Sequence, residues 1–137
     1  MSIFLFEAIF FIGLLDHGNI VQVQEEKIYT VNEVNVKPEP VKGMNDFHDK
    51  WSKGVVYPED AIREKIQGMV FIQFVVNIDG TIADASVKSG IGYGCDEAAL
   101  KGFKNVSKEI WKPGFKNDQN VKVKMVLPFA FRIIERK

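Results

Sequence analysis

The last part of the chain carries the pattern that most constrains its fold. Every second residue from Val121 to Ile133 is apolar. Lys122, Lys124 and Arg132 lie between these apolar positions. Successive side chains of a strand point to opposite faces, so this period of two predicts a strand with one buried face and one solvated face. Such a strand requires partner strands and an apolar layer packed on one side of the sheet.

Pro128 lies inside this predicted strand. Proline has no N–H group to donate to a neighbouring strand, so within sheets it is found mainly on edge strands. Backbone groups of alternate residues point to opposite edges, so even-numbered residues should direct theirs the same way as Pro128. We therefore expect Lys122, Lys124, Val126 and Ala130 to face an open edge. Lysines can protect such an edge, which can also accept a visiting strand.

Two further strands precede this one in the sequence. Met69–Ile78 alternates apolar and polar residues over much of its length, which predicts a half-buried strand. Asp79-Gly80 follows and is typical of a tight turn, because the turn needs a positive φ. The return strand is expected at Thr81–Lys88.

Helices are expected in three places. Pro58, followed by two acidic residues, predicts a short helix over roughly residues 58–66. Asn45–Lys53 places Phe47 and Trp51 one turn apart on one helical face. A third helix is indicated by apolar residues at helical spacing. These residues are Ala99, Phe103, Val106 and Ile110. The same spacing favours core positions for Phe103 and for the nearby Trp111.

The N-terminal apolar run from Ile3 to Leu15 is interrupted by Glu7. It is shorter than the ~20 residues that span a bilayer as a helix. Its length fits the apolar region of a signal peptide, although no Lys or Arg precedes it. We interpret residues 1–19 as a degenerate export signal, with a hydrophobic helix docked on the domain as the alternative. Residues 20–56 are expected to form an irregular lead-in with a β-like stretch at Ile28–Val31.

Charge and cysteine content exclude several classes of function. Lys and Arg number 18, as do Asp and Glu, which argues against a basic nucleic-acid-binding domain. Residues 112–137 nevertheless hold 7 basic and 2 acidic residues. This basic end is either a chance difference between solvated faces or a surface for a partner. One cysteine excludes an internal disulfide and a multi-thiolate zinc site, and His17 and His48 complete no metal-ligand pattern.

No catalytic set or cofactor site is predicted. Cys95 opens a helix, where a thiolate would be stabilised, but no histidine lies nearby in the sequence to activate it. We therefore expect an inert thiol. The loop Gly90–Gly94 is rich in glycine but is not followed by the Lys-Ser/Thr pair of a phosphate-binding loop, which favours a plain tight connection.

Six motifs in order resemble the C-terminal domain of the TonB energy-transducer family, and most closely its Bacteroidetes-type branch. They begin with Tyr57-Pro58-x-x-Ala61 and the strand Gly68–Val76, followed by Asp79-Gly80. They continue with the segment from Gly90 to Leu100, with Trp111-Lys112-Pro113-Gly114, and with the final strand containing Leu127-Pro128-Phe129-x-Phe131. The resemblance covers residues 57–134, which we take as the domain.

This resemblance implies an α+β fold, with two short helices packed on a three-stranded antiparallel sheet. It implies a periplasmic domain of a protein that couples an inner-membrane motor to outer-membrane receptors. A receptor segment would add itself beside the last strand. The partner-binding residues expected there are Lys122, Val123, Lys124, Met125, Val126, Leu127 and Ala130, with Tyr57 and Pro58 as further candidates.

Some alternatives remain open on sequence grounds. Tyr57 and Pro58 could only fix the start of a helix, and Lys122 and Lys124 could only protect an edge. The chain also departs from full transducers, because it has 5 prolines and no proline-rich arm. It is therefore expected to act as a periplasmic domain, and attachment to the inner membrane stays open on sequence grounds. Self-association through the same edge, giving a homodimer, is the alternative function.

Overall fold

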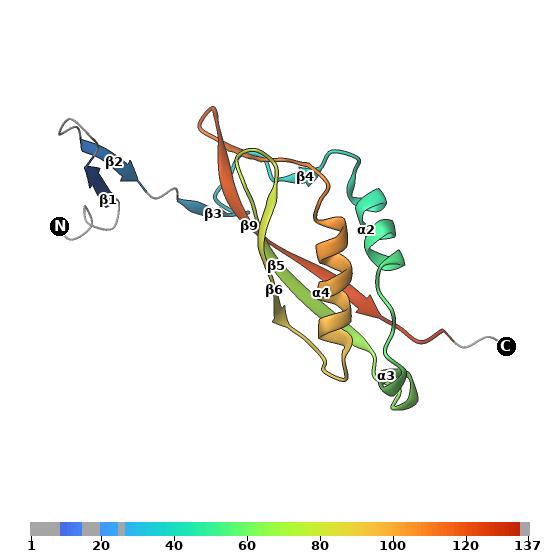
Figure 1. The fold of residues 1–137 in the computed structure, drawn as a ribbon. Coiled ribbons are helices and arrows are strands. Elements are labelled where there is room, and N and C mark those ends of the chain that lie inside the picture. Colours follow the sequence, from blue (N-terminus) through green and yellow to red (C-terminus); the bar gives the residue numbers. More distant parts are fainter. Residues whose placement is uncertain (1–8, 15–19, 25–26, 135–137) are drawn as a thin grey trace.

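The structure is a computed structural model that describes residues 9–14, 20–24 and 27–134 (Figure 1). Helices in these residues are α2 (Met44–Lys53), α3 (Glu59–Arg63) and α4 (Cys95–Val106). The strands are β1 (Ile9–Leu14), β2 (Ile20–Gln24), β3 (Ile28–Thr30), β4 (Glu39–Pro40), β5 (Gly68–Val76), β6 (Ile82–Ser89), β7 (Trp111–Lys112), β8 (Gly114–Lys116) and β9 (Gln119–Phe131).

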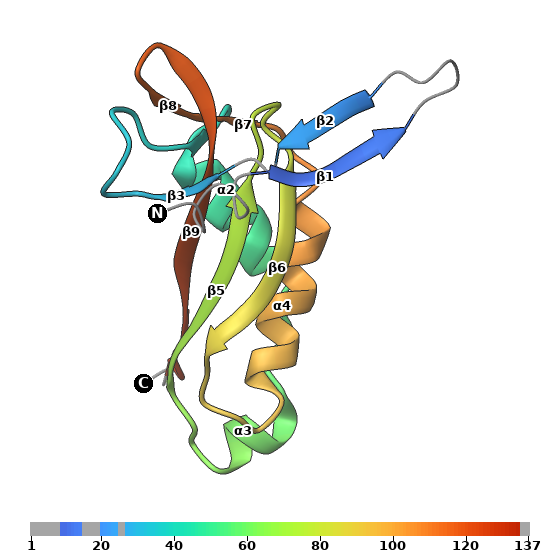
Figure 2. The ribbon, with the colours of Figure 1, turned by 90° about the vertical axis from the view of Figure 1, so that its left-hand side faces the viewer.

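The main sheet has the strand order β3-β9-β5-β6, and β8 also pairs with β9. β5 and β9 are antiparallel over nine consecutive pairs, from Gly68–Phe131 to Val76–Val123. α2 and α4 lie on one face of this sheet, and α3 lies at one end (Figure 2). The predicted α+β class is confirmed. The predicted count of three strands is wrong, because β3 and β8 also join the sheet.

The alternation of apolar residues is confirmed in both central strands. In β5, Val70, Ile72, Phe74 and Val76 are fully buried. In β9, Val123, Met125 and Phe131 are buried, whereas Phe129 is half-buried. The odd-numbered residues of β9 and the even-numbered residues of β5 are register partners, so they share the face that carries the core.

Aromatic rings fill the space between this face and the helices. Phe47 and Trp51 of α2, Phe103 of α4, Phe74 of β5 and Trp111 of β7 are buried and contact one another, largely edge to face. The indole Nε1 of Trp51 donates a 2.9 Å hydrogen bond to the carbonyl oxygen of Ala99, which satisfies this buried donor. The expected core positions of Trp111 and Phe103 are therefore confirmed.

The N-terminal apolar segment lies only partly within the described residues. Residues 9–14 and 20–24 form the antiparallel pair β1–β2. The alternative of a hydrophobic helix is therefore wrong for Ile9–Leu14. Short apolar runs do not distinguish strand from helix, and here Phe and Ile favour a strand while Gly13 disfavours a helix. Residues 1–8 and 15–19 lie outside the described part, so the export signal stays a prediction.

Candidate functional site

The main sheet has two lateral edges, and only one of them is regular. β6 forms the first edge, and its pairing with β5 shifts register twice, with an extra residue in β6 each time. Asp84 lies at one of these shifts and has a φ of 55°. Bulges of this kind twist an edge and oppose pairing with another chain. β9 pairs with β5 without any such shift. We call the side of β9 that is turned away from β5 the outer edge of β9.

The first part of the outer edge is occupied. β3 runs parallel to β9 there, with Ile28 opposite Lys122 and Thr30 opposite Lys124. The prediction that Lys122 and Lys124 face an open edge is therefore wrong. The error arose because the sequence gives no sign of which strand the β-like stretch Ile28–Val31 pairs with.

The second part of the outer edge, from Met125 to Phe131, pairs with no described strand. Pro128 lies within it, opposite Phe71 of β5. Val126 is half-buried, while Pro128 and Ala130 are exposed. If even-numbered residues direct their backbone groups outward, as Pro128 indicates, Val126 and Ala130 each offer a donor and an acceptor there. Pro128 offers an acceptor alone.

The odd-numbered site residues occupy the other face of the strand. Val123 and Met125 are buried in the core, and Leu127 is half-buried. Their side chains therefore position β9 against the helices. Because successive side chains alternate, the surface beside the outer edge is formed by Val126, Pro128 and Ala130 on the solvated face.

Tyr57 and Pro58 lie at the start of α3, away from this pairing register. The hydroxyl of Tyr57 donates to the carbonyl oxygen of Ile66, and its ring packs edge to face on Phe131 with centroids 5.1 Å apart. Burial raises the pKa of the Tyr57 phenol above its usual range. Pro58 is the N-cap residue of α3. Tyr57 therefore has a structural role in joining the α3 region to the end of β9, and Pro58 has one at the start of α3.

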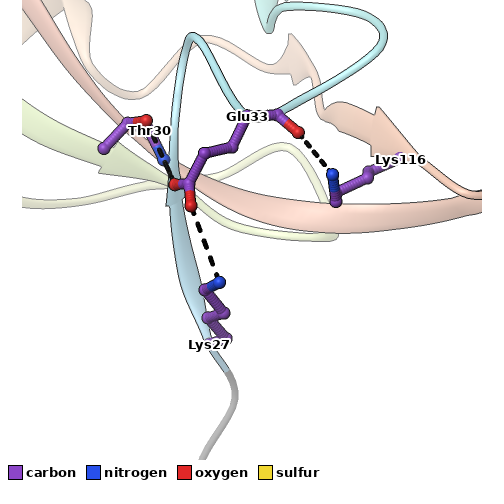
Figure 3. A network of polar contacts seen from close by, with 4 residues as sticks. All are labelled: Lys27, Thr30, Glu33 and Lys116. Carbon is purple, nitrogen blue, oxygen red and sulfur yellow. Dashed lines mark hydrogen bonds and ion pairs between the residues drawn. The ribbon is translucent and has the colours of Figure 1, made fainter.

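A polar network surrounds the end of β3 (Figure 3). The carboxylate of Glu33 accepts hydrogen bonds from the Thr30 backbone N–H at 2.7 Å and from the Thr30 hydroxyl at 3.1 Å. It also lies 3.6 Å from the Lys27 ammonium. The two hydrogen bonds from Thr30, helped by the charge of Lys27, lower the pKa of Glu33. Lys116 of β8 donates a 2.7 Å bond to the Glu33 carbonyl oxygen.

Sequence reasoning missed β3 and this network as parts of the site. The available signal is the β-branched and aromatic run Ile28-Tyr29-Thr30, which predicts a strand but not its partner. Its parallel pairing with β9 is a long-range contact that leaves no local pattern.

Cys95 and the Gly90–Gly94 loop, which were considered as reactive or phosphate-binding groups, both have structural roles. Cys95 is fully buried, and burial followed by the charges of Asp96 and Glu97 raises the pKa of its thiol. The Gly90–Gly94 loop folds around Asp96, whose carboxylate accepts bonds from the N–H groups of Ile91 and Gly92 at 2.9 and 3.2 Å. Among the described residues, no three His, Cys, Asp or Glu side chains gather as metal ligands would. No helix of the described residues is long and apolar enough to cross a membrane.

Two solved structures are similar to this chain. The NMR structure of Helicobacter pylori TonB-CTD (residues 194–285) is similar over 67% of this chain and 95% of that chain, with 25% identity and a TM-score of 0.49. The NMR structure of Pseudomonas aeruginosa TonB CTD is similar over 82% of this chain and 100% of that chain, with 20% identity and a TM-score of 0.44. A search of curated proteins found no match.

A family model described as the Gram-negative bacterial TonB protein C-terminal matches residues 53–133. The match covers more than half of the chain and includes every helix and strand from α3 to β9. The chain belongs to the family of TonB protein C-terminal domains.

Proposed function

We propose that this chain is a periplasmic TonB-type domain that binds a segment of an outer-membrane receptor by strand addition, in energy-dependent transport. The segment pairs with the outer edge of β9, which no described strand occupies from Met125 to Phe131. The observation that carries this proposal is a regular, unpaired strand edge in a protein of the TonB C-terminal family. The role is binding and involves no catalysis.

Backbone pairing suits a domain that serves several receptors. Main-chain hydrogen bonds supply affinity without reading side chains, and contacts to alternate side chains supply limited specificity. The exposed Pro128 and Ala130 and the half-buried Val126 present small or flat side chains to the visiting strand. A coupled inner-membrane motor, inner-membrane attachment and membership of the Bacteroidetes-type branch are part of the same proposal.

The experiment is a pull-down of receptor plug domains from outer-membrane extracts. The test variant is Val126→Pro, which removes one backbone donor from the outer edge. Val126→Thr is the matched control, because it keeps the N–H group and the β-branched shape. We expect wild type and Val126→Thr to capture receptors and a folded Val126→Pro to lose them. Equal capture by all three proteins would refute the edge assignment.

Self-association through the same edge is the second candidate, favoured by the same unpaired residues of β9. Sedimentation over a range of concentrations separates the two functions. A domain that only self-associates dimerises with rising concentration and captures no receptor. A receptor-binding domain captures receptors, whether or not it dimerises at high concentration.

A further inference from the structure

β3 lies on part of the edge that the proposed function requires. It pairs with Lys122–Lys124, and the unpaired edge begins at the next residue, Met125. A segment that paired with β9 from Lys122 to Phe131 would therefore have to take the place of β3. β3 and such a segment compete for the same backbone groups.

The attachment of β3 to β9 is small. The strand has three residues, and only Tyr29 is half-buried, against the core beside its register partner Val123. Ile28 and Thr30 are exposed. The ion pair between Lys27 and Glu33 is exposed too, and such pairs contribute little to stability.

The chain that follows β3 is held more firmly at a different strand. Asn35 and Val36 donate their N–H groups to the carbonyl oxygen of Phe115 at 2.9 and 3.0 Å. Phe115 returns a 3.0 Å bond to Val36, and the Asn35 side chain accepts 3.1 Å from the backbone N–H of Asn117. These bonds fix residues 35–36 to β8 and to the residue that follows it, without using β9.

A turn separates the two attachments. The N–H of Glu33 donates to the carbonyl oxygen of Thr30 at 3.1 Å, and the Glu33 side chain bonds back to Thr30. Rotation of the backbone between Val31 and Val34 would therefore release β3 while residues 35–36 stay attached to β8. In this arrangement residues 35–36 would act as a fixed base and the turn before them as a hinge for β3.

We propose that β3 is a displaceable strand that competes with the receptor segment for the outer edge of β9 and so lowers the affinity of the resting domain. This inference rests on the proposed function, since it concerns regulation of the same edge. The apparent affinity for a long segment is reduced in proportion to the fraction of molecules in which β3 is undocked. A segment that pairs only with Met125–Phe131 does not compete with β3.

The test locks β3 in place reversibly. Ile28 and Lys122 are register partners, and neighbouring strands lie within the Cα separation that a disulfide spans. The Ile28→Cys/Lys122→Cys variant is compared with itself before and after reduction, so misfolding cannot mimic the result. Cys95 is buried and stays outside the reaction. A second variant, Tyr29→Ala/Glu33→Gln, loosens β3 by removing its half-buried ring and by replacing the carboxylate in its turn with a weaker, neutral acceptor.

The probe is a fluorescent peptide of residues 27–33, the β3 sequence itself, added to the full chain. We expect the loosened variant to bind it at least about tenfold more tightly than wild type, because β3 no longer fills the site. The oxidised variant should show no binding, and reduction should restore the wild-type affinity. Equal binding to the oxidised, wild-type and loosened proteins would overturn the proposal.

Receptor plugs are then tested on the same set of proteins. Capture that weakens on oxidation supports both proposals. Capture that is the same for the oxidised and loosened proteins overturns the displacement of β3 and leaves the receptor function standing. If the peptide binds in the expected order while no protein captures a plug, the displaceable strand stands and the receptor function fails.

Discussion

The turn between β5 and β6 offers a measurable test of how β7 is attached to the domain. Gly80 has a φ of 84°, and an added Cβ would lie 2.1 Å from the carbonyl oxygen of Trp111. Its own carbonyl oxygen accepts a 2.9 Å bond from the Trp111 N–H. Gly80→Ala therefore forces the backbone of Gly80 away from the backbone of Trp111. The clash is costly because backbone cannot rotate out of the way as a flexible side chain can.

The expected cost has two parts. A left-handed φ costs a residue other than glycine roughly 1–2 kcal/mol. Separation of the backbones adds about 1–3 kcal/mol for overpacking, and more if the Trp111–Gly80 hydrogen bond is lost. We expect Gly80→Ala to lower the free energy of unfolding by roughly 3 kcal/mol, combining these two contributions.

Gly92 provides a matched control. Its φ is 77°, but an added Cβ would meet nothing within 4 Å. Gly92→Ala should therefore incur only the cost of the left-handed φ, roughly 1–2 kcal/mol. Urea unfolding followed by circular dichroism gives both values by linear extrapolation. Equal losses for the two variants would refute the conclusion that the contact with Trp111 sets the cost.

Three further predictions concern burial and charge. Phe74→Ala should destabilise the domain by about 3–5 kcal/mol in the same urea assay, and Phe129→Ala by less because its ring is half-buried; the reverse order would contradict the core assignment. Hydrogen bonds from Thr30 lower the pKa of Glu33 below 4.5, so its contribution to stability is present above that pH and lost as the pH falls through the lowered pKa. Wild type should thus exceed Glu33→Gln in stability at neutral pH, and the difference should shrink in urea titrations at acid pH; a difference that grew on acidification would contradict this sign. Because burial raises the pKa of the Cys95 thiol, its alkylation should be slow in the native protein and fast in urea. Rapid alkylation of the native protein would show that the thiol is accessible and would contradict its burial.

Local patterns in the sequence predict the centre of the fold well. The alternation of β5 and β9 identifies their buried faces, because one face of each strand packs on the helices. Pro128 correctly indicates that β9 has an unpaired stretch. Helix signals at Pro58 and along α4 place both helices, although α4 ends at Val106 and not at Ile110.

The periphery depends on contacts that local patterns do not encode. β3 and β9 are adjacent although Thr30 and Lys124 are far apart in sequence. The hairpin from β8 to β9 had a usable signal, since Asn117 and Asp118 both adopt a positive φ and suit a tight turn. Pro128 therefore predicts an open edge on β9. Only the structure shows that this open edge begins at Met125, where the pairing with β3 ends.

Amide hydrogen exchange at single-residue resolution tests the central claim most directly. In the free protein, the N–H groups of Leu127 and Phe129, which point to β5, should be protected, while those of Val126 and Ala130 should exchange rapidly. Addition of a captured receptor segment should protect Val126 and Ala130 and leave Leu127 and Phe129 little changed. If Val126 and Ala130 exchange equally fast with and without a bound receptor segment, the segment does not pair with the outer edge of β9.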